Sequence, residues 1–421
     1  MSFDIALSGI QAINDSLDVT SHNIANAGTY GYKSSRANFS SLVAGTQVTG
    51  VMVGSTTQNI GLQGGVLNTG RSMDASINGR GFFIARDAST GETQYTRVGI
   101  FSASKDGFLT DASGRKIQGY SVDGKTGTMG ALGDLAIPTG SIPAVVSSEV
   151  NYVGNLSADW TVPATTWNDA AVTPATPPDP STFNMSKATV IYDSLGGKHT
   201  LTQYFVRSGT TAAPTANSVD VHYVLDGKPV TTVSPATTPL TFNATTGAMN
   251  PIAPANNYEL SLDLSGVALS NGGKLGTVAV DYSGTTGFAG EATTSTNNAD
   301  GYAAGNYTGV SLAEDGSVVA SYTNGQKQTI GRLAIATFPD EGALTAVSDT
   351  AWITSINSGE PLVNTPGVGM GGTLTVSSLE QSNVDITSEL VGLMTSQRNY
   401  QANSKVIQTE STMMQALMQA I

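Results

Sequence analysis

The sequence contains no cysteine among its 421 residues. This absence excludes disulfide bonds, thiolate metal sites and cysteine nucleophiles. It is compatible with an exported surface protein, although cytosolic proteins can lack cysteine as well. Any chemistry that the chain performs must therefore rest on other residue types.

Charged residues and long apolar runs are also scarce. Only 12% of the residues are charged, against about 25% in an average soluble protein. The 19 basic and 32 acidic residues give a net charge of −13, so we expect no nucleic-acid partner. No apolar run approaches the roughly 20 residues that span a bilayer, so we expect no membrane insertion. The N-terminus carries Asp4 and has no basic residue before Lys33, which predicts the absence of a cleaved secretory signal.

Glycine is abundant, with 48 residues, and it marks turns between apolar runs. An Asp-Gly or Asn-Gly pair between two such runs is a strong hairpin signal. The pairs are Asp106-Gly107, Asp226-Gly227, Asp315-Gly316 and Asn324-Gly325. Segments 199–206 and 332–338 supply β-branched and aromatic residues. We therefore predict a mainly β fold in which about 300 central residues form all-β domains.

The N-terminal segment has the spacing of a helix with an apolar seam. Large residues recur every seven positions, and a second row follows three residues later. The seam residues are Phe3, Ile10, Ile13, Leu17 and Ile24. Because glycine is favoured just past a helix end, Ala27-Gly28 predicts the point where this helix stops.

The C-terminal segment repeats the same spacing over a longer stretch. Its seam residues are Ile386, Leu393, Tyr400, Ile407 and Met414. Residues 382–385 resemble a helix N-cap, so the helix should run for roughly 38 residues. A second row, offset by three residues from this seven-residue repeat, contains polar residues, namely Ser382, Glu389, Ser396 and Asn403.

Neither terminal helix has enough apolar surface to order itself alone. The first candidate partner for each helix is therefore the other one, in a coiled-coil-like pair. Two alternatives stay open at this point, namely packing of both helices on the chain's own β-domain and disorder of the two ends.

Long, collinear motifs lie at both ends of the chain and between them. The run Asn-Ile-Ala-Asn-Ala-Gly-Thr-Tyr-Gly-Tyr-Lys at 23–33 lies within the segment 6–39, and a second long motif covers 383–409. These two segments resemble the N-terminal and C-terminal signatures of the bacterial flagellar rod, hook and hook-associated proteins. Segments 77–87, 95–101 and 114–120 resemble the β-domain shared by hook and distal rod proteins, whereas 190–206, 310–326 and 331–344 resemble motifs of the hook proteins.

This resemblance implies an architecture and a role. Hook subunits pair their terminal segments as helices on assembly, form the inner tube around an export channel and transmit motor torque as a flexible universal joint. The implied partners are further copies of the chain, distal rod and hook-associated junction proteins, the hook cap and the flagellar export gate. The implied location is extracellular. Phe39 and Val43 match the aromatic-x-x-x-apolar pattern that the export gate recognises in this family, although two residues of an ordinary loop would match it too.

We expect four segments from the resemblance and the composition together. Residues 1–33 and 375–421 form the helical polymerisation domain, and 34–71 with 363–374 form a connecting segment. Residues 72–148 and 300–362 form an inner β-domain, and 149–299 form an outer β-domain.

Two alternatives remain, namely a distal rod protein with an enlarged insert and a secreted all-β adhesin or glycan-acting protein. His22, His199 and His222 are dispersed and show no metal-ligand spacing. We expect no catalytic residue, no cofactor and no metal.

Overall fold

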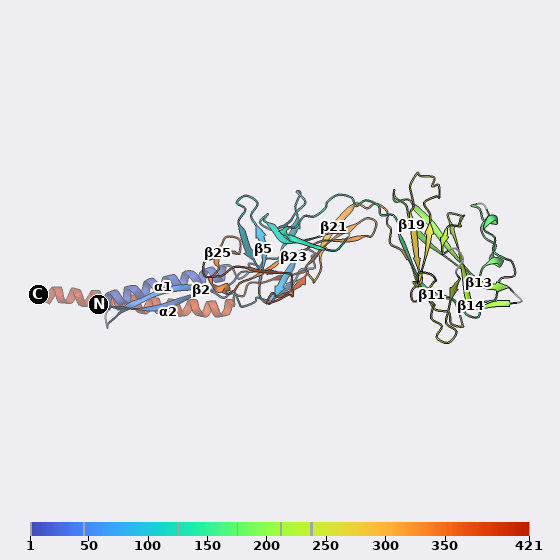
Figure 1. The fold of residues 1–421 in the computed structure, drawn as a ribbon. Coiled ribbons are helices and arrows are strands. Elements are labelled where there is room, and N and C mark those ends of the chain that lie inside the picture. Colours follow the sequence, from blue (N-terminus) through green and yellow to red (C-terminus); the bar gives the residue numbers. More distant parts are fainter. Residues whose placement is uncertain are drawn as a thin grey trace. The chain divides into compact units, whose positions relative to one another are not determined.

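A computed structural model describes all residues except 1, 45–46, 125, 175, 211–212, 236–238 and 421. The chain divides into two compact units. Unit 1 comprises residues 1–139, 308–321 and 327–421, and unit 2 comprises residues 140–307 and 322–326. The fold is mainly β with one long helix at each end of the chain, as the sequence predicts (Figure 1).

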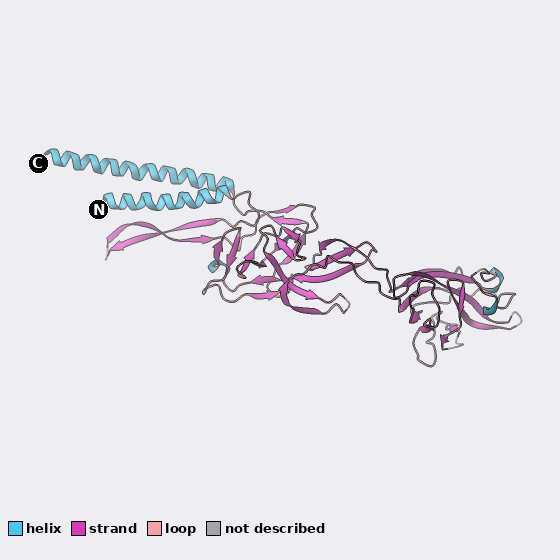
Figure 2. Cartoon of the chain, turned by 90° about the horizontal axis from the view of Figure 1, so that it is seen from above, coloured by secondary structure: helices cyan, strands magenta, loops and turns pink. Residues whose placement is uncertain are grey.

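The two helices belong to unit 1 and lie side by side (Figure 2). Helix α1 spans Ser2–Ala25 and helix α2 spans Ile386–Ala420. Asp385 caps α2, because its Oδ1 accepts from Thr387 N at 3.0 Å and its Oδ2 accepts from Ser388 Oγ at 2.8 Å. Helix α1 ends two residues before the predicted stop at Ala27, because the chain enters a turn at Asn26.

A long two-stranded ribbon packs against α1. It consists of β1 (Ser35–Ala44) and β2 (Gln47–Gln58), which pair antiparallel. Val51 N donates to Ser8 Oγ of α1 at 3.2 Å. The same hydroxyl lies 2.4 Å from the position of a Cβ on Gly50, so the absence of a side chain there lets the ribbon approach the helix.

The main sheet of unit 1 is built from both halves of the chain. β5 (Phe82–Arg86) pairs with β9 (Lys116–Val122) and with β24 (Ile335–Thr337), and β9 also pairs with β23 (Lys327–Leu333). A second region of this sheet joins β6 (Thr93–Thr96) to β26 (Ala351–Ile353). Its other strands are β7 (Phe101–Ala103), β8 (Leu109–Asp111), β10 (Met129–Asp134), β21 (Tyr307–Leu312), β22 (Ser317–Tyr322), β25 (Thr345–Val347) and β27 (Leu362–Asn364).

An aromatic core stabilises this part of unit 1. Phe82, Tyr95 and Phe338 are buried. Phe338 contacts both Phe82 and Tyr95 edge to face, and Phe82 also contacts Trp352. A short 3-10 turn, η3 (Glu341–Ala343), follows Phe338.

Two short pairings join the last strands before α2 to the N-terminal half of unit 1. β28 (Thr373–Val376) pairs with β4 (Ala75–Asn78), and β29 (Ser378–Glu380) pairs with β3 (Val66–Asn68). The segment that leads into α2 is therefore held by main-chain hydrogen bonds before the helix begins.

Unit 2 contains two sheets around one core. The first sheet has the order β16 (Val233–Ser234), β18 (Glu259–Asp263), β19 (Thr277–Asp281), β11 (Glu149–Asn155) and β20 (Thr293–Ala299). The second has β12 (Met185–Tyr192), β13 (Lys198–Thr210), β14 (Ala213–Leu225) and β15 (Lys228–Val230) in order, with β17 (Leu240–Thr241) beside β14. Two 3-10 turns, η1 (Asp169–Ala171) and η2 (Pro180–Thr182), lie in the proline-rich loop before β12.

Buried tyrosines fill the core of unit 2 and satisfy their hydroxyl groups there. Tyr223 and Tyr282 share a hydrogen bond of 2.7 Å, and Tyr282 Oη donates to Gln203 Oε1 at 2.6 Å. The four predicted Asp-Gly and Asn-Gly pairs all lie in turns between neighbouring strands of the two units. At Asp226-Gly227 both residues have positive φ, which is the conformation that favours this pair in a two-residue hairpin turn.

Candidate functional site

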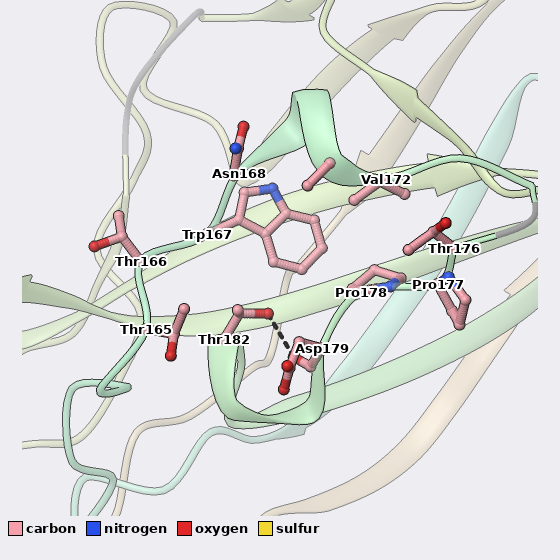
Figure 3. Close-up of a pocket in the computed structure, with 11 residues that line it drawn as sticks. Thr165, Thr166, Trp167, Asn168, Val172, Thr176, Pro177, Pro178, Asp179 and Thr182 are labelled. Atoms are coloured by element: carbon pink, nitrogen blue, oxygen red, sulfur yellow. Dashed lines mark hydrogen bonds between the residues drawn. The ribbon is translucent and has the colours of Figure 1, made fainter.

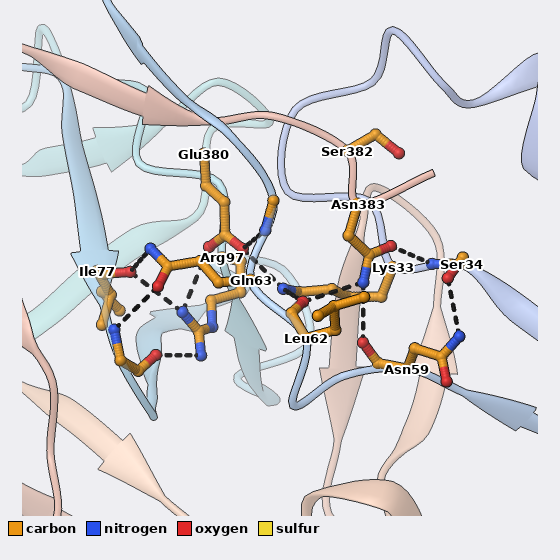
Figure 4. A network of polar contacts seen from close by, with 12 residues as sticks. Lys33, Ser34, Asn59, Leu62, Gln63, Ile77, Arg97, Glu380, Ser382 and Asn383 are labelled. Carbon is orange, nitrogen blue, oxygen red and sulfur yellow. Dashed lines mark hydrogen bonds and ion pairs between the residues drawn. The ribbon is translucent and has the colours of Figure 1, made fainter. Parts of the chain in front are cut away.

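Three buried charged residues hold the base of both helices to the β-structure of unit 1 (Figure 4). Lys33, Arg97 and Glu380 are 1%, 2% and 1% exposed. Lys33 Nζ lies 2.7 Å from Glu380 Oε1, and Arg97 Nη1 lies 3.3 Å from Glu380 Oε2. Burial lowers the pKa of Lys33 and of Arg97, and the Glu380 carboxylate opposes both shifts.

Main-chain groups satisfy further polar atoms of this cluster, although Arg97 Nε has no hydrogen-bond partner among the described residues. Lys33 Nζ donates to Leu62 O at 2.7 Å, and Arg97 Nη2 donates to Gly79 O at 2.8 Å. Gly64 N donates to Glu380 Oε1 at 3.1 Å. Buried charges are tolerated only when they are paired and hydrogen-bonded in this way. Because Lys33 follows α1 and Glu380 precedes α2, the cluster fixes where both helices start from the β-structure.

Two asparagines extend the connection from this cluster to the helices. Asn23 is buried in α1, and its Nδ2 donates to Ser35 O at 2.7 Å and to Glu389 Oε1 of α2 at 2.8 Å. Asn383 accepts from Ser34 N at 2.7 Å through Oδ1 and donates to Leu62 O at 3.0 Å through Nδ2. The segments after α1 and before α2 are thus joined to each other directly.

The helices run antiparallel in a fixed register. Asn23 contacts Glu389, and a Cβ on Gly9 would lie 2.8 Å from Asn403 Nδ2. From the first contact to the second, the position moves back by fourteen residues on α1 and forward by fourteen residues on α2, as an antiparallel pair requires. Glycine at position 9 disfavours the helix by about 1 kcal/mol relative to alanine. The structure explains why a glycine stands there, because the Asn403 amide occupies the space that a side chain would need.

The predicted seam residues differ in how far this single chain covers them. In α1, Ile13 is buried, Ile10, Leu17 and Ile24 are half-buried, and Phe3 is exposed. In α2, Leu393 and Ile407 are half-buried, whereas Ile386, Tyr400 and Met414 are exposed. The role of these residues in polymerisation stays a prediction.

On α1 the residues Ala6 and Thr20 of the second predicted row are buried. The seam also contains residues that the pattern does not select, because Gly9, Ala12 and Asn23 of α1 are buried as well. On α2 the half-buried positions include Glu389, Ser396, Asn403 and Glu410. The α2 residues occupy the row three positions after the apolar one, so the heptad spacing contains the signal although their polarity hides it.

Beyond Glu410, α2 extends past the start of α1. Helix α1 begins at Ser2, and the register places this residue beside the region of Glu410. The following residues of α2 are exposed, and four of them are large and apolar, namely Met413, Met414, Leu417 and Met418. The chain itself provides no cover for this apolar surface among its described residues.

The structure places the predicted export residues on the ribbon rather than in a loop. Phe39 and Val43 lie on β1, opposite Val53 and Val48 of β2. Their side chains are 53% and 57% exposed. The two residues are therefore accessible in this chain.

A second polar cluster lies in unit 2, where His199 bridges two carboxylates. Its Nδ1 is 2.6 Å from Asp226 Oδ2, and its Nε2 is 3.1 Å from Asp193 Oδ2. Burial disfavours the imidazolium, but hydrogen bonds and charges from Asp226 and Asp193 outweigh burial and raise the pKa of His199. Burial likewise opposes ionisation of Asp193, but hydrogen bonds from Asn271, His199 and main-chain amides hold its pKa well below the usual value. No pattern in the sequence indicated this cluster.

This cluster predicts that the stability of unit 2 falls in alkaline solution. Because the folded pKa of His199 is raised, its contribution is fully present below the ordinary value of 6.5 and is lost as the pH rises through the folded pKa. Asp193 contributes above its ordinary value of 3.8 and loses this contribution only in strong acid. Urea denaturation at a series of pH values should show this decline, and His199→Gln should flatten it.

A matched control is available in α1. His22 is an exposed helical histidine, so His22→Gln should leave the pH profile of unit 2 unchanged. An equally steep alkaline decline in the His199→Gln variant would contradict the assignment.

The described residues contain no cluster of three or more His, Asp or Glu placed to hold a metal ion. None of their helices combines the length and apolar character required to cross a membrane.

Comparisons with known proteins cover nearly the whole chain. Family models match at residues 76–158 (flagellar hook protein FlgE/F/G D1 domain), 155–302 (flagellar basal body protein FlaE D2 domain) and 376–420 (flagellar basal body rod FlgEFG protein C-terminal). The flagellar hook protein FlgE of Escherichia coli strain K12 is 32% identical over 426 residues, which cover 99% of each chain. The chain belongs to the flagellar hook protein family.

Other members of the hook protein family agree with this placement. The FlgE proteins of Salmonella typhimurium and Brucella suis are 31% and 32% identical over 435 and 418 residues, which cover 99% and 96% of those proteins. The crystal structure of Helicobacter pylori hook protein FlgE2 superposes with a TM-score of 0.50 at 14% identity, and the match covers 75% of this chain and all of that one. At this identity the solved structure supports the fold alone.

Proposed function

We propose that this chain is the structural subunit of a flagellar hook and polymerises through its terminal helices into a flexible tube that encloses an export channel. The observation that carries the proposal is the antiparallel pairing of α1 with α2, which leaves much of α2 uncovered. Exposed apolar residues at the end of a helix are costly in water, and contact with neighbouring copies would bury them.

The buried charge cluster supports the same proposal. A tube that transmits torque requires a stiff connection between the inner helices and the outer β-structure. Lys33, Arg97 and Glu380 provide it, because they join both helix bases to strands of unit 1. Hook subunits need no catalytic residue, so the proposed role is structural and not enzymatic.

The predicted four-segment division remains part of the proposal. Residues 1–33 and 375–421 would form the inner tube, and 72–148 with 300–362 and 149–299 would form the inner and outer β-domains. The distal rod, the hook-associated junction proteins and the hook cap are the proposed partners outside the homopolymer. The proposed location is outside the cell, with export through the flagellar gate and without signal cleavage.

The proposal is tested by removing residues 385–421. We expect a folded β-body that stays monomeric in sedimentation and forms no tubes in electron micrographs, whereas the full chain forms tubes. Tube formation by the truncated chain would contradict the proposal.

A role in the flagellar rod is the alternative. Two of the matched family models cover FlgE, FlgF and FlgG together, and one of the two is named for the basal body rod. The match over 99% of hook relatives favours the hook. Electron microscopy of basal bodies with the labelled chain distinguishes the two, since a hook subunit lies outside the outer-membrane rings.

Phe39 and Val43 are proposed as the residues that the export gate recognises. Their exposure on β1 makes them accessible to a partner. We expect that Phe39→Ala with Val43→Ala strongly reduces the amount of chain secreted by an otherwise normal cell, without lowering its synthesis. Leu42→Ala with Met52→Ala, which changes two other exposed apolar residues of the ribbon, serves as the control. Normal secretion of the Phe39/Val43 variant would exclude the export role.

A further inference from the structure

A hollow of about 310 Å³ in unit 2 is lined by residues from 165–172 and 176–182 (Figure 3). Its apolar wall contains Trp167, Val172, Pro177 and Pro178, and its remaining wall is mostly threonine. The lining residues include no lysine or arginine. The volume is at the lower end of the range for small-molecule sites.

Trp167 is held with one ring face on the sheet beneath it. Its ring stacks on the His222 ring, with 4.7 Å between the ring centroids and an interplanar angle of 16°. The centroid of the Tyr204 ring lies 5.0 Å from that of Trp167. Tyr204 and His222 are cross-strand partners on β13 and β14, so both lie on the same side of the indole. Burial lowers the pKa of His222, which keeps the stacked imidazole uncharged near neutral pH. The opposite face of Trp167 is left for the hollow.

The indole nitrogen is already satisfied. Trp167 Nε1 donates to Asp169 Oδ1 at 2.7 Å, so the available part of this side chain is its π-face. Such a rigid face, fixed before a ligand arrives, is suited to stacking against the C–H groups of a ring.

Two polar side chains beside Trp167 keep hydrogen-bonding capacity. Asn168 Oδ1 accepts from Ala170 N at 3.0 Å, and Asp179 Oδ1 accepts from Ser181 N at 2.9 Å. Within the described part of the chain, Asn168 Nδ2 has no partner, and the Asp179 carboxylate, which Ser181 contacts through its amide and its hydroxyl, keeps further capacity to accept. The hydrogen bonds from Ser181 lower the pKa of Asp179, so its carboxylate stays an acceptor.

We propose that this hollow binds a neutral pyranose sugar. One face of the sugar ring stacks on Trp167, a hydroxyl group donates to Asp179, and another hydroxyl accepts from Asn168. The chemistry selects a neutral sugar, because Asp169 and Asp179 repel anions and no cation is present among the lining residues to bind a carboxylate or phosphate. This site belongs to unit 2, whereas the terminal helices belong to unit 1.

In the experiment, methyl glycosides of glucose, galactose, mannose and N-acetylglucosamine are added to the full chain up to high millimolar concentration. The signals of its labelled tryptophan indoles report binding. At least one glycoside should shift the Trp167 signal and leave the Trp352 signal of unit 1 in place. Calorimetry should show that Trp167→Ala abolishes binding, whereas Trp167→Phe, which retains a stacking ring, preserves part of it.

Asp179→Asn tests the hydrogen bond separately. Asparagine caps a helical turn as well as aspartate does, so the loop should keep its form while affinity falls by about tenfold. Trp160→Phe is the matched control and should leave binding unchanged. The proposal is overturned if no neutral glycoside shifts the Trp167 signal, if binding survives in Trp167→Ala, or if glucuronate or inorganic phosphate binds as tightly as the neutral sugars.

Discussion

Replacing Glu380 with alanine should destabilise unit 1 by about 3–5 kcal/mol, because it leaves two buried cations without their counter-charge. Lys33 and Arg97 each contact one oxygen of this carboxylate and are almost fully buried. Neither cation can turn towards water without breaking its hydrogen bonds to main-chain carbonyls. The loss should therefore exceed that of most single substitutions.

Chemical denaturation measures this loss when the signal comes from unit 1 alone. Trp160 and Trp167 lie in unit 2, so their replacement with phenylalanine leaves Trp352 of unit 1 as the reporter. Arg332→Gln is the control, because Arg332 and Asp315 form an exposed ion pair at 3.0 Å that should contribute less than about 1 kcal/mol. A loss of similar size in both variants would show that burial of the cluster has no special effect.

Replacing Ile407 with aspartate should abolish tube formation while the free subunit stays folded. Ile407 is half-buried in the helix pair of one chain, so its replacement by a carboxylate can still be hydrated there. In a closed tube the same carboxylate would lose its water without gaining a partner. We expect no tubes in electron micrographs and a change of less than about 1 kcal/mol in the unfolding free energy of the monomer.

Thr409→Asp is the matched control for this variant. It introduces the same charge two residues away, at an exposed position of α2. We expect tubes from this variant. Tubes from Ile407→Asp, or a large loss of monomer stability in it, would instead favour packing of α2 within its own chain as the main role of the seam.

Local sequence patterns predicted the elements but not their partners. The heptad spacing, with the capping signals, located the end of α1 and the start of α2 to within two or three residues. The Asp-Gly and Asn-Gly pairs located turns between strands. These signals are local, because helix periodicity and turn conformation depend on neighbouring residues. The coiled-coil-like character and the polymerising role of the helices stay predictions.

Such local patterns could not predict the buried contacts between residues that are distant in the sequence. Lys33 and Glu380 are 347 positions apart, and a lone lysine and a lone glutamate have no spacing that identifies them as partners. The same holds for His199, whose carboxylate partners come from two different turns. Asn403 and Glu389 did occupy heptad positions, but polar residues at these positions gave no sign of a contact with α1.

Hydrogen exchange of the two helices, in the free and in the assembled protein, distinguishes order that arises on assembly from order within one chain. Amides of residues 2–25 and 386–420 should exchange rapidly in the free subunit, since little apolar surface covers α2, and should become strongly protected in the tube. The strands of unit 1 should be protected in both states. Equal, strong protection of both helices in the free subunit would contradict the account, because the helices would then owe their order to the chain's own fold.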